Sequence, residues 1–146
     1  MATYQVFVNK GTLSDKEKES VAQAITDTHC EISSTPKYCI QVIFHEVTDN
    51  NRFICGRRLS TIMWINAEIR PHSPELAEDF MNKLTERTAK VCNFYKENIW
   101  VDLSETAPTN FFRYEKVFCE AGGEEAWYNE LPQEAKETIA RMLEDI

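Results

Sequence analysis

The sequence predicts an α/β protein: two tandem β-α-β units form one four-stranded sheet with two helices on one face, and a C-terminal tail with a short helix follows. Three observations carry this prediction. An alternating strand pattern begins almost at the first residue, a strand–helix–strand order follows it, and the same pattern recurs 59 residues later. So short a crossover favours right-handed connection and parallel strand pairing within each unit.

The first strand is expected in MATYQVFVNK, residues 1–10. Tyr4, Val6 and Val8 occupy alternate positions, which is the pattern of a half-buried strand. Most chain ends fray, so a strand at this place holds the terminal amine against the rest of the protein. The sequence therefore raises the question of what that amine lies beside.

The first helix is expected to start after Ser14, because Ser14 and Glu17 have the spacing of a capping box. SSTPKY then breaks the helix, and CIQVIFHEV is rich in branched and aromatic residues, as a second strand would be. The apolar stripe of the helix is expected to include Val21, Ala24, Ile25 and His29.

The second unit repeats the first in register, which indicates an internal duplication. Its strands are IMWINAEI and IWVDLSE. The nine matching pairs, from helix start to strand end, are Ser14/Ser73, Glu19/Glu78, Val21/Phe80, Ile25/Leu84, Thr26/Thr85, Ile40/Ile99, Val42/Val101, Phe44/Leu103 and Glu46/Glu105.

We predict a single domain over residues 1–146, with repeat one at about 2–58, repeat two at about 61–106 and a tail over 107–146. Two helices cover one face of the sheet, so the other face, expected to carry Phe7, Ile43 and Met63, needs another cover. Self-association is the commonest way to provide it.

The tail is expected to end in a helix that starts after Pro132. Gly122 and Gly123 indicate a turn or hinge, because no phosphate-loop motif follows them. The apolar stripe of this last helix is predicted to consist of Ala135, Ile139 and Met142 or Leu143.

Composition excludes several classes of function. The net charge of −8 argues against nucleic acid or an anionic membrane as partner, and no apolar run is long enough to span a bilayer. The five cysteines are scattered without a CxxC pair, so we expect reduced thiols and a cytoplasmic location. His45 and His72 lack metal-ligand spacing, and neither a metal nor a cofactor is expected.

Three stretches of the sequence point to a protein family. They are AQAITDTH, NIWVDLSETAP and EEAWYNELPQEAK. Together with the strand at the first residue and the duplicated unit, they resemble the tautomerase superfamily, and within it the cis-3-chloroacrylic acid dehalogenases and their fungal relatives. The resemblance covers nearly the whole chain. It implies a homotrimer in which the free faces of the sheets pack around a central core.

In that family the catalytic group is the terminal amine of a proline, whose pKa is lowered in an apolar pocket so that it acts as acid or base near neutrality. Arginines hold the substrate carboxylate in a bidentate manner, and a histidine assists in positioning. A tyrosine and a glutamate activate water for dehalogenation. The implied substrate here is a small carboxylate or 2-oxo acid.

The matching positions of this chain keep only part of that set. Excision of Met1 is favoured before a small residue, so the resemblance places Ala2, and not a proline, at the catalytic amine. His29 matches the family histidine and is the second catalytic candidate. Arg70 matches the first carboxylate-binding arginine if the strand before it is aligned without a gap.

Three further substrate-binding candidates stand where the family has other residues. His72 falls at the second arginine, Asp102 at the tyrosine and Arg113 at the glutamate, so the water-activating pair is absent and dehalogenation is not expected. A buried Asp102 would need a partner, which Arg113 would supply; otherwise both face solvent as separate surface charges. Both arrangements stay open.

Three functions remain open from the sequence. The first is a divergent enzyme that acts on a small carboxylate or 2-oxo acid, with weak or altered tautomerase or lyase activity. The second is a family member that has lost catalysis and binds a small anion or a protein partner. The third is a slow, promiscuous tautomerase without a dedicated substrate.

Overall fold

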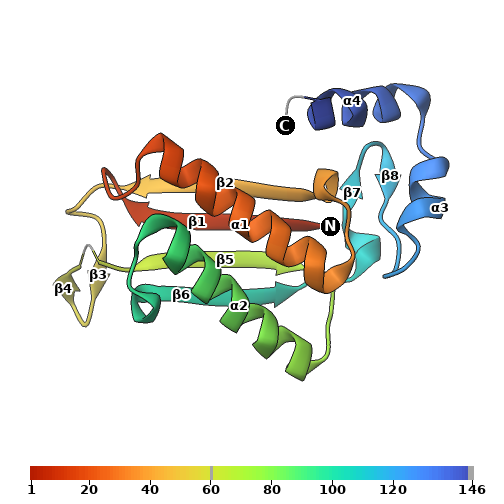
Figure 1. Ribbon diagram of the computed structural model, residues 1–146. Coiled ribbons are helices and arrows are strands. Elements are labelled where there is room, and N and C mark those ends of the chain that lie inside the picture. The colour runs from red at the N-terminus through yellow and green to blue at the C-terminus, as the bar shows by residue number, and fades with distance from the viewer. Residues whose placement is uncertain (60, 145–146) are drawn as a thin grey trace.

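A computed structural model describes residues 1–59 and 61–144 of the chain (Figure 1). Both expected β-α-β units are present, each with a short 3₁₀ turn before its second strand. The elements of the two units are β1 (Ala2–Asn9), α1 (Asp15–Ser33), η1 (Lys37–Cys39), β2 (Ile40–Val47), β5 (Met63–Ile69), α2 (Pro74–Cys92), η2 (Lys96–Asn98) and β6 (Ile99–Glu105).

The four long strands form one mixed sheet in the order β2-β1-β5-β6. Pairing is parallel within each unit, β1 with β2 and β5 with β6, and antiparallel where β1 meets β5. Figure 1 shows α1 and α2 lying side by side across the same face of this sheet. The predicted fold class is confirmed.

The core lies between that face and the helices. Tyr4, Val6 and Val8 are buried there, as their alternation predicted. The strand parity of β5 was predicted wrongly: Met63 is fully buried under the helices, and Trp64 takes the opposite face. Ile65 and Ile69 point into the same core as Met63, and because side chains alternate along a strand they fix which neighbour faces outward.

Both long helices begin at the predicted serines. The Ser14 hydroxyl accepts from the backbone N–H of Glu17, whose carboxylate accepts from the backbone N–H of Ser14, so the capping box is complete. Ser73 caps α2 in the same way from its side chain. Each helix ends at a residue with positive φ, Ser34 and Asn93, in the left-handed conformation that closes many helices.

Two small hairpins, a 3₁₀ turn and two further helices make up the rest of the described structure. The first hairpin joins the units and projects from one end of the sheet, while the remaining elements gather at the other end, beside the N-terminus (Figure 1). These elements are β3 (Phe53–Ile54), β4 (Arg57–Arg58), η3 (Pro108–Asn110), β7 (Phe112–Arg113), β8 (Lys116–Val117), α3 (Glu124–Asn129) and α4 (Gln133–Glu144).

The C-terminal elements build a second apolar cluster around the side chain of Met1. Ala135 and Ile139 of α4 are buried in it, as predicted, but Met142 and Leu143 are 39% and 46% exposed. Met142 lines an open cavity beside Met1 and Ala2 instead of joining the cluster. The buried members are Met1, Cys39, Phe111, Phe118, Trp127, Leu131, Ala135 and Ile139.

Among the residues described, no helix has the length and apolarity to cross a membrane.

Candidate functional site

The N-terminus lies where the sheet meets the second apolar cluster. Met1 and Ala2 are each 1% exposed, so almost all of the surface of the first two residues is buried. Burial, and secondarily the positive charge of Arg70, lowers the pKa of the Met1 α-amine from 8.0 to about 5. The amine is therefore largely unprotonated at neutral pH and has the state of a base.

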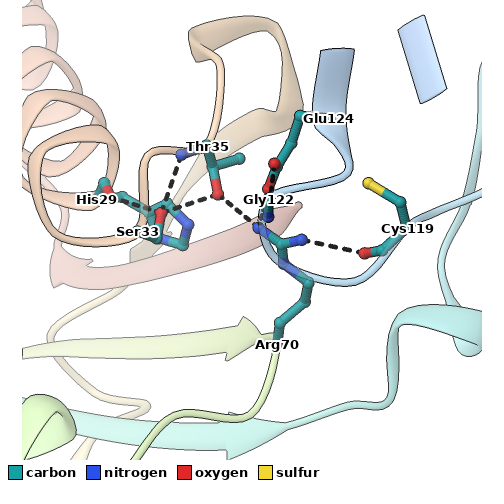
Figure 2. Close-up of polar contacts among 7 residues, drawn as sticks. All are labelled: His29, Ser33, Thr35, Arg70, Cys119, Gly122 and Glu124. Carbon is teal, nitrogen blue, oxygen red and sulfur yellow. Dashed lines mark hydrogen bonds and ion pairs between the residues drawn. The ribbon is translucent and has the colours of Figure 1, made fainter. Parts of the chain in front are cut away.

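Arg70 follows β5 directly and is held entirely by protein groups, as Figure 2 shows. Its Nη2 donates to Thr35 Oγ1 at 3.0 Å and to Glu124 Oε1 at 2.6 Å. Its Nη1 donates to the carbonyl of Cys119 at 3.0 Å, and the guanidinium lies 4.7 Å from the ring centre of Phe118. With 4% of its surface exposed, the predicted carboxylate anchor already holds an internal carboxylate.

That carboxylate belongs to Glu124, the first residue of α3. Burial by itself raises the pKa of Glu124, but the hydrogen bonds from Arg70 and from backbone N–H groups, including that of Gly122 at 2.9 Å, outweigh it and hold the pKa below its usual range. The ion pair fastens the tail to the end of β5. Sequence reasoning missed Glu124, since nothing in the run GGEEAW marks one acid over the other.

His29 lies on the buried face of α1, and Tyr4 of β1 approaches it. The Tyr4 hydroxyl is 2.6 Å from His29 Nδ1. Burial, followed by the charge of the terminal amine, lowers the pKa of His29 from 6.5 to about 3, so the ring is neutral. His72, which precedes α2, lines the same small void as His29. The structure thus brings these two predicted residues together and adds Tyr4, which the sequence marked only as core.

Arg113 of β7 lies at the wall of an open cavity of about 480 Å³, which Met1 and Ala2 also line. Its Nη2 lies 3.4 Å from Thr3 Oγ1, and its Nη1 donates to the Phe112 carbonyl at 3.1 Å. Within residues 1–59 and 61–144 no carboxylate forms an ion pair with Arg113. The guanidinium is available to an anion entering the cavity.

Two tyrosines that the sequence did not single out line the same cavity. Tyr38 and Tyr114 stand with their rings 6.3 Å apart, and the Tyr114 hydroxyl donates to the Tyr38 carbonyl at 2.7 Å. Burial raises the pKa of Tyr38 to about 12, so its phenol stays neutral. The cavity therefore combines aromatic walls with one cation and the chain terminus.

Asp102 is separate from all these residues. It lies exposed on the sheet face opposite the helices, where its carboxylate accepts from Trp64 Nε1 at 2.7 Å. The pairing of Asp102 with Arg113, one of the two arrangements left open, does not occur within the chain. No group of three or more metal-ligating side chains occurs in the described part of the chain.

Comparisons with known proteins bear on the family and the fold of this chain. The sequence profile of the family described as "Putative oxalocrotonate tautomerase enzyme" matches residues 1–111. The chain belongs to the tautomerase superfamily. The matched segment of this tautomerase-superfamily chain contains both β-α-β units and ends before Arg113, Glu124 and the last two helices.

Solved structures extend the likeness. A crystal structure of N1, a member of the cis-3-chloroacrylic acid dehalogenase family, is 30% identical with a TM-score of 0.89, over 95% of this chain and 99% of that one. A native fused 4-OT shares the fold at 18% identity and a TM-score of 0.71, over 79% and 94% of the two chains. A fused 4-OT described as an asymmetric trimer has 20% identity and a TM-score of 0.70, over the same shares. The curated protein sequences gave no significant match.

Proposed function

We propose that this chain binds a small carboxylate, such as a 2-oxo acid, beside its first strand and moves a proton on it slowly, as a weak or altered tautomerase or lyase. One observation carries the proposal: the Met1–Ala2 end of β1 and Arg113 line the same cavity. An amine with a pKa of about 5 and a guanidinium without an acidic partner in the described residues are the base and the anchor that this chemistry needs.

The amine would act as the proton carrier. In the ketonisation of an enol, the amine takes the proton from the enol oxygen, which becomes the carbonyl oxygen, and as ammonium returns a proton to the other carbon of the C=C bond, so that atoms and charge balance. In the chain that begins at Met1 the amine is that of Met1. Excision of Met1 would transfer the role to Ala2 and would also remove a buried side chain from the second apolar cluster, which leaves more room for a ligand.

Arg113 would hold the substrate carboxylate, and it takes over the role that the family resemblance assigned to Arg70. Arg70 supports the site from behind by lowering the pKa of the amine. His29 and His72 belong to the void behind the strand, where His29 is a neutral positioning group. Arg113 stays protonated, because an arginine is always charged in proteins, and Asp102 lies on the sheet face opposite the helices. Neither residue therefore supplies the base that dehalogenation requires.

A second candidate function rests on the Arg70–Glu124 pair. If the family's carboxylate position is permanently filled by Glu124, the chain has lost catalysis and binds a small anion or a protein partner at the open cavity. The two functions differ in whether bound carboxylate is turned over.

We further propose a homotrimer assembled through the sheet face opposite the helices. Phe7 stacks between His45 and Trp64 on that face, with ring centres 4.4 and 4.8 Å apart. Trp100 and Ile43 are 47% and 37% exposed beside them. An apolar and aromatic surface of this kind on one side of a sheet is typical of an interface.

The deciding experiment is the ketonisation of phenylenolpyruvate, followed by ultraviolet absorbance. We expect the native protein to exceed the uncatalysed rate. Arg113→Ala should lower the catalysed rate at least about tenfold, which is the equivalent of one charge-assisted hydrogen bond. Arg58→Ala, which changes an exposed arginine on the hairpin at the other end of the sheet, is the matched control. Intact mass identifies whether Met1 or Ala2 is the first residue.

Native protein without activity would contradict the enzymatic proposal. An Ala2→Pro form with confirmed excision of Met1 then separates two explanations. Activity of that form alone would mean that the cavity survives but its chemistry is lost, in favour of the binding function. Inactivity of both forms would show that this cavity does not support ketonisation of phenylenolpyruvate with either terminal amine.

A further inference from the structure

The small void between α1 and α2 is lined by two histidines and mainly apolar side chains, and the proposed function leaves it unused. It measures about 10 Å³, which is room for a single water molecule. His29 and His72 face it from the two units of the fold, and Ile69 and Phe80 supply apolar wall. The wall is mainly apolar, and the two imidazoles and Ser33 contribute its polar groups.

His72 contributes an unsatisfied atom to this void. Its Nδ1 is buried without a hydrogen-bond partner in the described residues. Its backbone N–H is fixed by the Glu105 carboxylate at 3.1 Å, which holds the residue in place before α2. Leaving a buried polar atom without a hydrogen-bond partner is destabilising, so native proteins supply a partner, which is often an ordered water.

The contact with Tyr4 determines which ring nitrogen of His29 carries the proton. Tyr4 is fully buried, and the only hydrogen bond that its hydroxyl makes in the described residues is with His29 Nδ1. If the hydroxyl accepted there instead of donating, its own proton would remain buried without an acceptor. The Tyr4 O–H therefore donates to Nδ1, and the neutral His29 ring carries its single proton on Nε2.

We infer that the void holds one bound water that accepts from His29 Nε2–H and donates to His72 Nδ1. The resulting chain runs Tyr4 O–H to His29, His29 to water and water to His72, and every buried nitrogen in it is satisfied. Tyr4 and His72 are thus positioning residues that lock His29 in one tautomer.

The first test is a high-resolution crystal structure of the full chain together with nitrogen-15 NMR of labelled histidine at neutral pH. We expect density for one water in the void and a single neutral His29 tautomer protonated on Nε2. An empty void, or a proton on His29 Nδ1, overturns the inference. Neither readout depends on enzymatic activity, so the inference can fail or succeed independently of the proposed function.

Variants sharpen this test. Tyr4→Phe removes the donor, and the His29 signals should then show a mixture of tautomers. His72→Leu removes the acceptor and fills the void, so the water should be absent and exchange of the His29 Nε2–H with solvent should become about tenfold faster, as expected for one lost hydrogen bond. His45→Leu, on the opposite sheet face, is the matched control and should leave His29 unchanged. Unaltered His29 signals in both Tyr4→Phe and His72→Leu would refute the chain.

Discussion

The Glu124 carboxylate lies 2.6 Å from Nη2 of Arg70, so a residue of the C-terminal tail occupies the carboxylate-binding face of the arginine that ends β5. Both side chains are nearly inaccessible to solvent, at 5% and 11% exposure. The pair joins two parts of the chain that are far apart in sequence. It also turns an expected ligand contact into an internal one.

We predict that Glu124→Ala destabilises the protein by about 3–5 kcal/mol, because Arg70 is left as a buried charge without its partner. Urea unfolding followed by tryptophan fluorescence measures the loss. Glu125→Ala, which removes the exposed neighbouring acid, is the control and should change the free energy of unfolding by less than about 0.5 kcal/mol. Equal effects of the two substitutions would show that the ion pair contributes nothing.

Stability should also fall as the pH is lowered from 8. The folded-state pKa values of the terminal amine and His29 are about 5 and about 3, against 8.0 and 6.5 for the ordinary groups. The unfolded chain therefore binds protons that the folded chain refuses, and each group lowers stability by up to about 1.4 kcal/mol per pH unit inside its own window. For the amine this window runs from 8 to about 5, and for His29 from 6.5 to about 3.

Urea unfolding at half-unit steps between pH 8 and 5.5 isolates these two groups from most carboxylates. His29→Gln should flatten the slope below pH 6.5 while leaving the part above pH 7 unchanged. His45→Gln, which alters a histidine on the open sheet face, should keep the native slope. A slope unaffected by His29→Gln would mean that His29 does not titrate abnormally.

The core between the sheet and helices should respond strongly to truncation. Leu84 of α2 is fully buried, so Leu84→Ala is expected to cost about 2–5 kcal/mol through lost burial and the cavity left behind. Leu143→Ala makes the same chemical change at a side chain that is 46% exposed, and should cost less than about 0.5 kcal/mol. Thermal unfolding in parallel measures both, and comparable losses would contradict the assigned burial.

The proposed trimer depends on the aromatic face of the sheet. Phe7→Asp places a charge between His45 and Trp64, and we expect it to shift the protein from trimer to monomer in sedimentation velocity. Val91→Asp changes an exposed apolar residue on the outer side of α2 and should leave the assembly intact. A native protein that sediments as a monomer would reject the trimer itself.

The sequence by itself determined the long strands and helices of the two units and their duplication. Alternation placed Tyr4 and Val6 on the covered face, and the capping box at Ser14 fixed the start of α1, because both signals are local and depend on neighbours two to four residues away. The 59-residue repeat then implied the four-stranded sheet. Where the local pattern was ambiguous, as in the apolar run Ile62–Met63–Trp64, the predicted parity was wrong.

Only the tertiary structure decided which charges meet. Arg70 pairs with Glu124, which lies 54 residues away in the sequence. Asp102 contacts Trp64 on the sheet face opposite the helices, and Arg113 lines the cavity beside Met1. The positions of Glu124 and Arg113 depend on how the tail folds back at the end of the sheet, and no spacing along the chain encodes that path. The contact of Asp102 with Trp64 depends on the pairing of β5 with β6. Burial then sets the protonation of the amine and His29, because desolvation is a property of the folded surroundings and not of the residue.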